Sequence, residues 1–164
     1  MAFTYSVVAE SDLLVGWGWG RITADEIVEA ARLLPSLPGY RAGIDRITVI
    51  HPDALLSEMS PAALRDLRAH LRGYDHVPDG TEPPSPLPLY RSALVSEGLM
   101  AGILLKLYGE YGNTEPDRIG EFRMFANPAD ALVWLGRDGV ALPPAPYEEP
   151  DGVAPPRAVG QDRS

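Results

Sequence analysis

The chain has 164 residues, of which 45% are apolar, and this is the size and composition of one globular domain with a hydrophobic core. Its 14 Lys and Arg residues stand against 23 Asp and Glu residues, and the formal net charge of −9 argues against nucleic acid and anionic membranes as partners, because their phosphates would repel it. The absence of cysteine excludes disulfides, thiol nucleophiles and zinc–thiolate sites. We expect a cytoplasmic protein without a signal peptide. We also expect no membrane span, because the longest apolar run, residues 99–105, is far shorter than the about 20 residues that a helix needs to cross a bilayer.

The N-terminal part of the chain predicts a β-hairpin. Residues 3–9 are rich in β-branched and aromatic residues, residues 10–12 suit a turn, and residues 13–20 suit a second strand. Alternate residues of that second strand are large and apolar, namely Leu13, Val15, Trp17 and Trp19. The positions between them that face the other side include Gly16, Gly18 and Gly20. We therefore expect one face that is thick and apolar and one face that other groups approach closely.

Strands and helices alternate after this hairpin. Thr23 and Glu26 have the spacing of a capping box, which predicts a helix from Thr23 to about Leu34. Two further helices begin at Ser60–Pro61 and Asn127–Pro128, each with a capping side chain followed by proline, and a third spans residues 99–111. The remaining strands are expected at residues 44–50, 90–97 and 121–126. This order predicts an α/β fold with a mixed, mostly parallel sheet and crossover helices.

Proline marks the expected limits of the domain. Residues 74–89 hold five prolines, which do not fit a helix or a sheet and predict an exposed insertion. Residues 137–164 are rich in proline and in small and acidic residues, which predicts a tail. The domain is thus expected to span residues 1–136.

The two central helices differ in their patterns. In the helix after Ser60, Leu64, Leu67 and Leu71 are expected to face inward, and Arg65, Arg68 and Arg72 to form the solvated side. The helix at residues 99–111 is instead apolar around most of its circumference, as buried or interface helices are. We assign its sheet-facing side to Met100, Ile103, Leu104, Leu107 and Tyr111. The surplus residues Leu99, Leu105 and Tyr108 then predict a homodimer surface or a surface for an apolar ligand.

Three segments resemble the SpoIIAA-like group of the STAS superfamily, small bacterial domains related to anti-sigma-factor antagonists and described together with Sec14-like lipid-binding domains. They are Gly20–Thr23, Leu37–Asp45, and Phe122–Phe125 running into Ala129–Gly136. The resemblance covers about residues 3–136 and implies a regulatory fold whose phosphorylated Ser or Thr precedes the helix after the third strand. Ser57 and Ser60 are the approximate counterparts, but Ser60 is expected to cap its helix and acidic residues lie nearby, so we predict no phosphoswitch.

Polar residues follow the expected strands where ligands of open α/β sheets tend to bind. Those we select as a binding crevice are Arg21, His51, Asp53, Ser96 and Glu97. A crevice of this mixed charge would suit a small molecule or a loop of a partner. The alternative is that Ser96 and Asn127 cap helices and His51 closes a turn.

No catalytic motif accompanies these features. The sequence has neither an H-E-x-x-H metal motif nor a G-x-S-x-G nucleophile elbow, and its strand glycines lie inside a strand rather than in a phosphate loop. We therefore expect no enzyme activity, no cofactor and no metal site. The leading hypothesis is a regulatory or scaffolding module that binds a protein partner, a second copy or a small ligand. The alternative is a carrier of an apolar small molecule or lipid, which the apolar helix and the Sec14 side of the resemblance favour.

Overall fold

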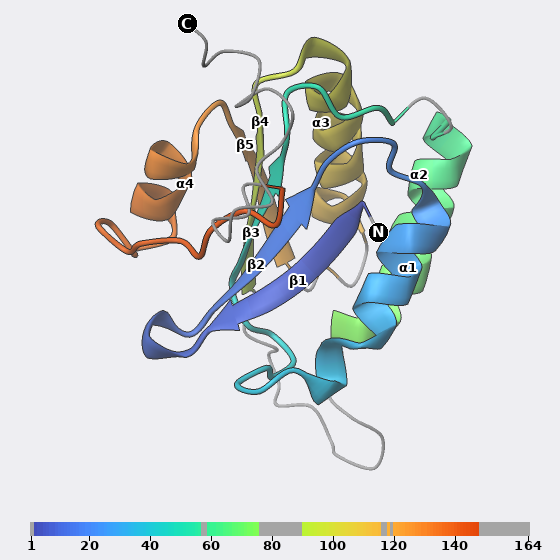
Figure 1. The fold of residues 1–164 in the computed structure, drawn as a ribbon. Coiled ribbons are helices and arrows are strands. Elements are labelled where there is room, and N and C mark those ends of the chain that lie inside the picture. Colours follow the sequence, from blue (N-terminus) through green and yellow to red (C-terminus); the bar gives the residue numbers. More distant parts are fainter. Residues whose placement is uncertain (1, 57–58, 76–89, 116–117, 119, 148–164) are drawn as a thin grey trace, which may run out of the picture.

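The structure is a computed structural model that describes residues 2–56, 59–75, 90–115, 118 and 120–147. It has the predicted α/β fold, with a five-stranded sheet in the order β1-β2-β3-β4-β5 (Figure 1). The strands are β1 (Phe3–Val8), β2 (Leu13–Gly18), β3 (Arg46–Ile50), β4 (Tyr90–Ser96) and β5 (Gly120–Phe125). The hairpin partners β1 and β2 are antiparallel, and the other neighbours are parallel.

The helices cover the two faces of the sheet unequally. Three of them, α1 (Ala24–Arg32), α2 (Pro61–Asp75) and α3 (Leu99–Asn113), lie on one face, and α4 (Pro128–Trp134) lies on the other (Figure 1). Each face therefore has its own hydrophobic core. The local start signals are confirmed at the three capped helices, because Thr23, Ser60 and Asn127 each accept a hydrogen bond from a backbone amide three residues later.

The inner strand β2 has the two different faces that its sequence predicts. Leu13, Val15 and Trp17 belong to the core on the α4 side. On the other side, a Cβ atom added to Gly18 would lie 2.7 Å from Cδ1 of Ile50, so the sheet approaches its neighbours closely there. The strand ends at Gly18, two residues before the expected end, and Gly20 then adopts a positive φ of 65°.

The packed part of the chain continues past the expected boundary at Gly136. Arg137 donates hydrogen bonds to the β1–β2 turn and to Asp45, and Ala145 is buried in the α4-side core. Tyr147 packs on the same core. The rest of the expected tail, and the expected insertion apart from Tyr74 and Asp75 at the end of α2, lie outside the described residues.

Within the described ranges, no helix is long and apolar enough to cross a membrane.

Candidate functional site

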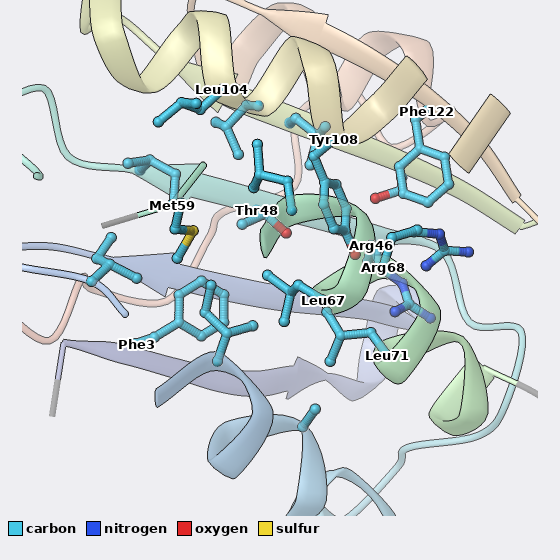
Figure 2. Close-up of a pocket in the computed structure, with 18 of the residues that line it drawn as sticks. Phe3, Arg46, Thr48, Met59, Leu67, Arg68, Leu71, Leu104, Tyr108 and Phe122 are labelled. Atoms are coloured by element: carbon cyan, nitrogen blue, oxygen red, sulfur yellow. The ribbon is translucent and has the colours of Figure 1, made fainter. Parts of the chain in front are cut away.

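A cavity of about 70 Å³ lies between the sheet and the three helices α1, α2 and α3 (Figure 2). Its wall is mostly apolar, with Phe3 from β1, Leu67 and Leu71 from α2, and Leu104 from α3. The side chains that face it from the central strands are different. Because alternate residues of a strand point to the same face, β3 presents Arg46 and Thr48 to the cavity, and β4 presents Tyr90 and Ser92.

Two arginines form the polar end of this cavity. Arg46 of β3 is 8% exposed and Arg68 of α2 is 2% exposed. Both contact Tyr90, since the guanidinium of Arg46 lies 4.3 Å from the centre of its ring and Nη2 of Arg68 lies 3.4 Å from its hydroxyl oxygen. Figure 2 shows these two guanidinium groups together at one end, with Phe3 and Met59 toward the other.

Arg68 is also held by a carboxylate. Its Nε atom donates to Oε2 of Glu115 at 3.1 Å, and its Nη2 atom donates to Oε1 at 3.3 Å, which is the two-pronged geometry of a strong arginine–carboxylate pair. The guanidinium carbon lies 4.8 Å from the ring centre of Phe122. The pair is well shielded from solvent, with side-chain exposures of 3% for Arg68 and 16% for Glu115.

The expectation that Arg68 belongs to the solvated side of its helix is wrong. Position 68 lies four residues after Leu64 and three before Leu71, so it shares their buried face of the helix. Arg65 does lie on the outer side, where its guanidinium covers the ring of Tyr111 at 5.0 Å. The side chain of Arg72 lies outside the described part of the structure.

The face of α3 that meets the rest of the domain agrees only in part with the expected one, because Leu104, Leu107 and Tyr111 pack against the core as expected but other residues do not. Leu105 and Tyr108, expected to be surplus on the outside, line the cavity, whereas Ile103, expected to face the sheet, is 53% exposed. Leu99 is exposed as expected, at 79%. The helix also packs closely on β5 at a glycine, because a Cβ atom added to Gly112 would lie only 2.4 Å from Cε1 of Phe122. Whether Leu99, Leu105 and Tyr108 bind a second copy or a ligand stays a prediction.

The five residues selected at the strand ends do not line the cavity. They lie near the carboxyl ends of the parallel strands. Ile50 of β3 pairs with Ser96 of β4, which places the residues that follow these strands side by side. Two side-chain hydrogen bonds at these strand ends are local to turns. The amide of Asp53 donates to Nδ1 of His51 at 3.1 Å, and the amide of Gly98 donates to Oγ of Ser96 at 3.1 Å. Arg21 forms a parallel bridge with Leu55. A binding role for Arg21, His51, Asp53, Ser96 and Glu97 stays a prediction.

Of the two phosphorylation candidates, Ser57 and Ser60, only Ser60 lies within the described residues. Ser60 caps α2, because its Oγ accepts from the amide of Ala63 at 3.1 Å. Ser57 lies outside the described residues. The prediction that neither serves as a switch is untested.

Within the described residues, no group of three or more His, Asp or Glu side chains is placed to hold a metal ion. None of the residues selected at the strand ends lines the cavity, but the sequence did carry a signal for it. Arg46 is the first residue of an inner strand whose other residues are mostly apolar, and a charged residue buried in such a strand needs polar partners.

Comparison of the chain with protein-family models, with curated proteins and with solved structures found no match in any of the three. The chain is therefore described by its architecture, an α/β domain with a five-stranded mixed sheet, an N-terminal antiparallel hairpin and a cavity under its three-helix face.

Proposed function

We propose that this protein is a non-enzymatic binding module of the cytoplasm, and that its binding site is the cavity between the sheet and α1, α2 and α3. The observation that carries the proposal is the pair of buried arginines at one end of an otherwise mostly apolar space. Sites for small molecules are typically concave and apolar with a few polar groups that orient the ligand. The module would act as a carrier of an apolar small molecule or as a regulator that responds to one, and the resemblance to STAS and Sec14-like domains agrees with both.

The size of the cavity limits the ligand. A volume of about 70 Å³ is well below the roughly 300–1,000 Å³ of sites for drug-sized ligands. It exceeds the roughly 30 Å³ that one water molecule occupies in the liquid. The wall from α3 is the less enclosed one, because its lining residues Leu104, Leu105 and Tyr108 are only half-buried. A larger ligand would therefore enter by displacing side chains of α3 rather than those of the sheet.

The proposal is tested with xenon, an apolar probe atom small enough for a cavity of about 70 Å³, whose binding to the full chain is followed by xenon NMR. We expect saturable binding of one probe per chain. The variant Ala31→Val adds two methyl groups to the cavity wall, so it should weaken binding of the probe. The matched control is Ala129→Val, at an exposed position of α4 on the opposite face, which should bind like the wild type.

Circular dichroism would show that both variants keep their secondary structure. The absence of saturable binding by the wild type would refute the proposal. Equal binding by Ala31→Val and the wild type would place the probe elsewhere and would refute it as well.

A second candidate function, scaffolding through a second copy of the chain, is favoured by the outer side of α3. Leu99 and Ile103 lie one helical turn apart and are 79% and 53% exposed. Sedimentation velocity should then show a dimer that Ile103→Glu dissociates and that Lys106→Glu, at another exposed position of α3, leaves intact. A monomeric wild type would remove this candidate.

A further inference from the structure

We infer that the free edge of β5 is a docking site for an extended peptide segment of a partner protein. The segment adds to β5 as an antiparallel strand, with an apolar side chain toward α3 followed by an acidic side chain on the opposite face. This edge is a different place from the cavity, so the inference goes beyond the proposed function and does not rest on it.

The side chain of Asn113 shows which kind of group this edge binds. β5 is the last strand of the sheet, so one of its edges has no neighbouring strand among the described residues. There the carboxamide of Asn113 accepts from the amide of Phe122 at 2.8 Å and donates to its carbonyl oxygen at 2.9 Å. A carboxamide has the acceptor and the N–H donor of a peptide group, and one residue of an antiparallel neighbour exchanges the same two bonds. Asn113 is thus a substitute for a partner strand at Phe122.

Met124, two residues farther along β5, lacks such a substitute. The backbone N–H and C=O groups of a strand point to alternate edges, so those of Met124 point to the same edge as those of Phe122. Within the described part of the chain, no residue forms a hydrogen bond with them on that side. An open donor and acceptor on an edge strand are the groups to which an added strand pairs.

A groove of about 240 Å³ lies beside this edge, between α3 and β5. Its apolar lining comes from Leu94 and Phe122, which are buried, and from Met124, which is half-buried. Lys106 and Glu110 of α3 are exposed and line it as well. A side chain of the added strand directly opposite Met124 shares its face of the sheet and enters this groove, so an apolar side chain fits there.

The other face of the added strand meets a positive charge. Arg123 is exposed, and its guanidinium carbon lies 5.5 Å from the ring centre of Trp134, on the α4 side. In an antiparallel partner, the residue that follows the one opposite Met124 lies opposite Arg123. An acidic residue at that position forms a cross-strand pair of opposite charges, which stabilises strand pairing.

The test uses the pentapeptide Thr-Val-Thr-Val-Glu with both ends blocked, titrated into the full chain and followed by the backbone amide NMR signals. Its second valine matches Met124, and its glutamate matches Arg123. We expect the amide signal of Met124 to shift saturably. Absence of binding, or shifts confined to residues outside α3 and β5, would overturn the inference.

Methylation of single backbone nitrogens of the peptide gives matched controls. N-methylation of the second valine removes the donor that faces β5, so the affinity should fall about fivefold or more. N-methylation of the middle threonine, whose N–H points away from β5, should leave the affinity unchanged. Equal affinities of the two methylated peptides, or the reverse order, would overturn the inference, because binding would not depend on this strand pairing.

The charge is tested by replacing the glutamate of the peptide with glutamine. The wild type should bind the glutamine peptide about two- to fivefold more weakly, as an exposed ion pair is lost. Arg123→Met should bind both peptides equally, and the control Arg65→Met, at an exposed position of α2, should keep the preference for glutamate. Equal binding of the two peptides by the wild type, or a preference that survives in Arg123→Met, would overturn the acidic part of the assignment.

Sedimentation velocity tests the other occupant of this edge, which is a second copy of the chain. We expect that the pentapeptide leaves the sedimentation coefficient of the wild type unchanged. A wild-type dimer that the peptide dissociates would assign the edge to a second copy and would overturn the assignment to a partner protein.

Discussion

At Gly18 the backbone of β2 lies so close to its neighbours that a methyl group does not fit without movement. A Cβ atom there would lie 2.7 Å from Cδ1 of Ile50 and 2.8 Å from Cδ1 of Ile22. Gly18→Ala should therefore lower the free energy of unfolding by about 1–3 kcal/mol, the usual cost of overpacking a core. Gly16→Ala is the matched control, because its nearest contact, Cε1 of Tyr5, is at 3.1 Å and belongs to a half-buried ring.

Urea unfolding of both variants checks this prediction. We expect a clearly larger loss for Gly18→Ala than for Gly16→Ala. Equal losses, or a gain of stability at Gly18, would show that the isoleucines move aside at little cost.

A second residue makes stability depend on pH. The hydrogen bond from Arg41 holds the pKa of Asp12 below the 3.8 of an unperturbed aspartate. A group whose pKa is lower in the folded state stabilises the protein above its unfolded pKa, and this contribution is lost as the pH falls through the folded pKa. Both side chains are about half exposed, so the pair is worth at most about 1 kcal/mol.

Asp12→Asn tests that effect, because Asn tolerates the left-handed φ of 52° at this position and has no charge. We expect the variant to be less stable than the wild type at neutral pH, and the difference to shrink as the pH falls below 3.8. Urea unfolding at several pH values measures it. A difference independent of pH would mean that the ion pair contributes nothing.

At the scale of elements, the end of α3 protects the free edge of the sheet. The side chain of Asn113 accepts from the amide of Phe122 at 2.8 Å and donates to its carbonyl oxygen at 2.9 Å, so it takes the place of a neighbouring strand beside β5. An open edge strand is a template for pairing with other chains. Asn113 therefore both stabilises β5 and opposes association.

Asn113→Ala should lower the free energy of unfolding by about 1–3 kcal/mol, because two hydrogen bonds are lost. It should also cause association that depends on protein concentration, which light scattering would detect. Thr114→Ala is the control, since its hydroxyl bonds only to the exposed end of α3. If Asn113→Ala stayed as stable and as monodisperse as the control, Asn113 would not protect the edge.

At the scale of the whole molecule, Arg137 ties three distant segments together. Its guanidinium donates to the carbonyl oxygens of Ser11 and Asp12, at 2.8 and 2.9 Å, and to the carboxylate of Asp45 at 2.8 Å. The pair with Asp45 is largely shielded from water, with side-chain exposures of 17% and 19%. The segment after α4 thus holds the hairpin turn against the start of β3.

Arg137→Met should cost about 2–4 kcal/mol of unfolding free energy, because it leaves a partly buried carboxylate and two carbonyl groups without their donor. The control Arg32→Met breaks an exposed pair with Glu29, whose side-chain exposures are 58% and 54%, and should cost about 0.5 kcal/mol or less. Urea unfolding compares the two variants. Similar small losses of unfolding free energy in both variants would show that Arg137 does not hold these segments together.

The hydrophobic cores on the two faces of the sheet differ in composition. On the α4 side, Leu13, Val15, Ile47 and Ala93 are fully buried, and the described segment up to Tyr147 packs over them. On the three-helix side, the core contains polar groups and a cavity. Fully buried apolar residues lie on both faces, and the candidate binding site occupies the three-helix face.

The sequence by itself determined the elements, their order and the class of the fold. The helix starts at Thr23, Ser60 and Asn127 depend on contacts within four residues, so the amino acids there are sufficient to predict them. The alternation of large residues and glycine along β2 is likewise a property of neighbouring residues, and it correctly predicted one apolar face and one closely approached face. Parallel pairing followed from the alternation of strands and helices.

Only the tertiary structure decided the site. The side of α3 that faces inward could not be derived in full from its sequence, because apolar residues surround that helix and its close contact at Gly112 is with Phe122, a residue of β5. Arg68 and Glu115 are 47 residues apart in the chain, and Arg46 meets Tyr90 from another strand. Such contacts depend on how the helices dock on the sheet, so local patterns do not identify the partners. The helical spacing of Arg68 with Leu64 and Leu71 places it on the buried face, and there it becomes part of the cavity wall.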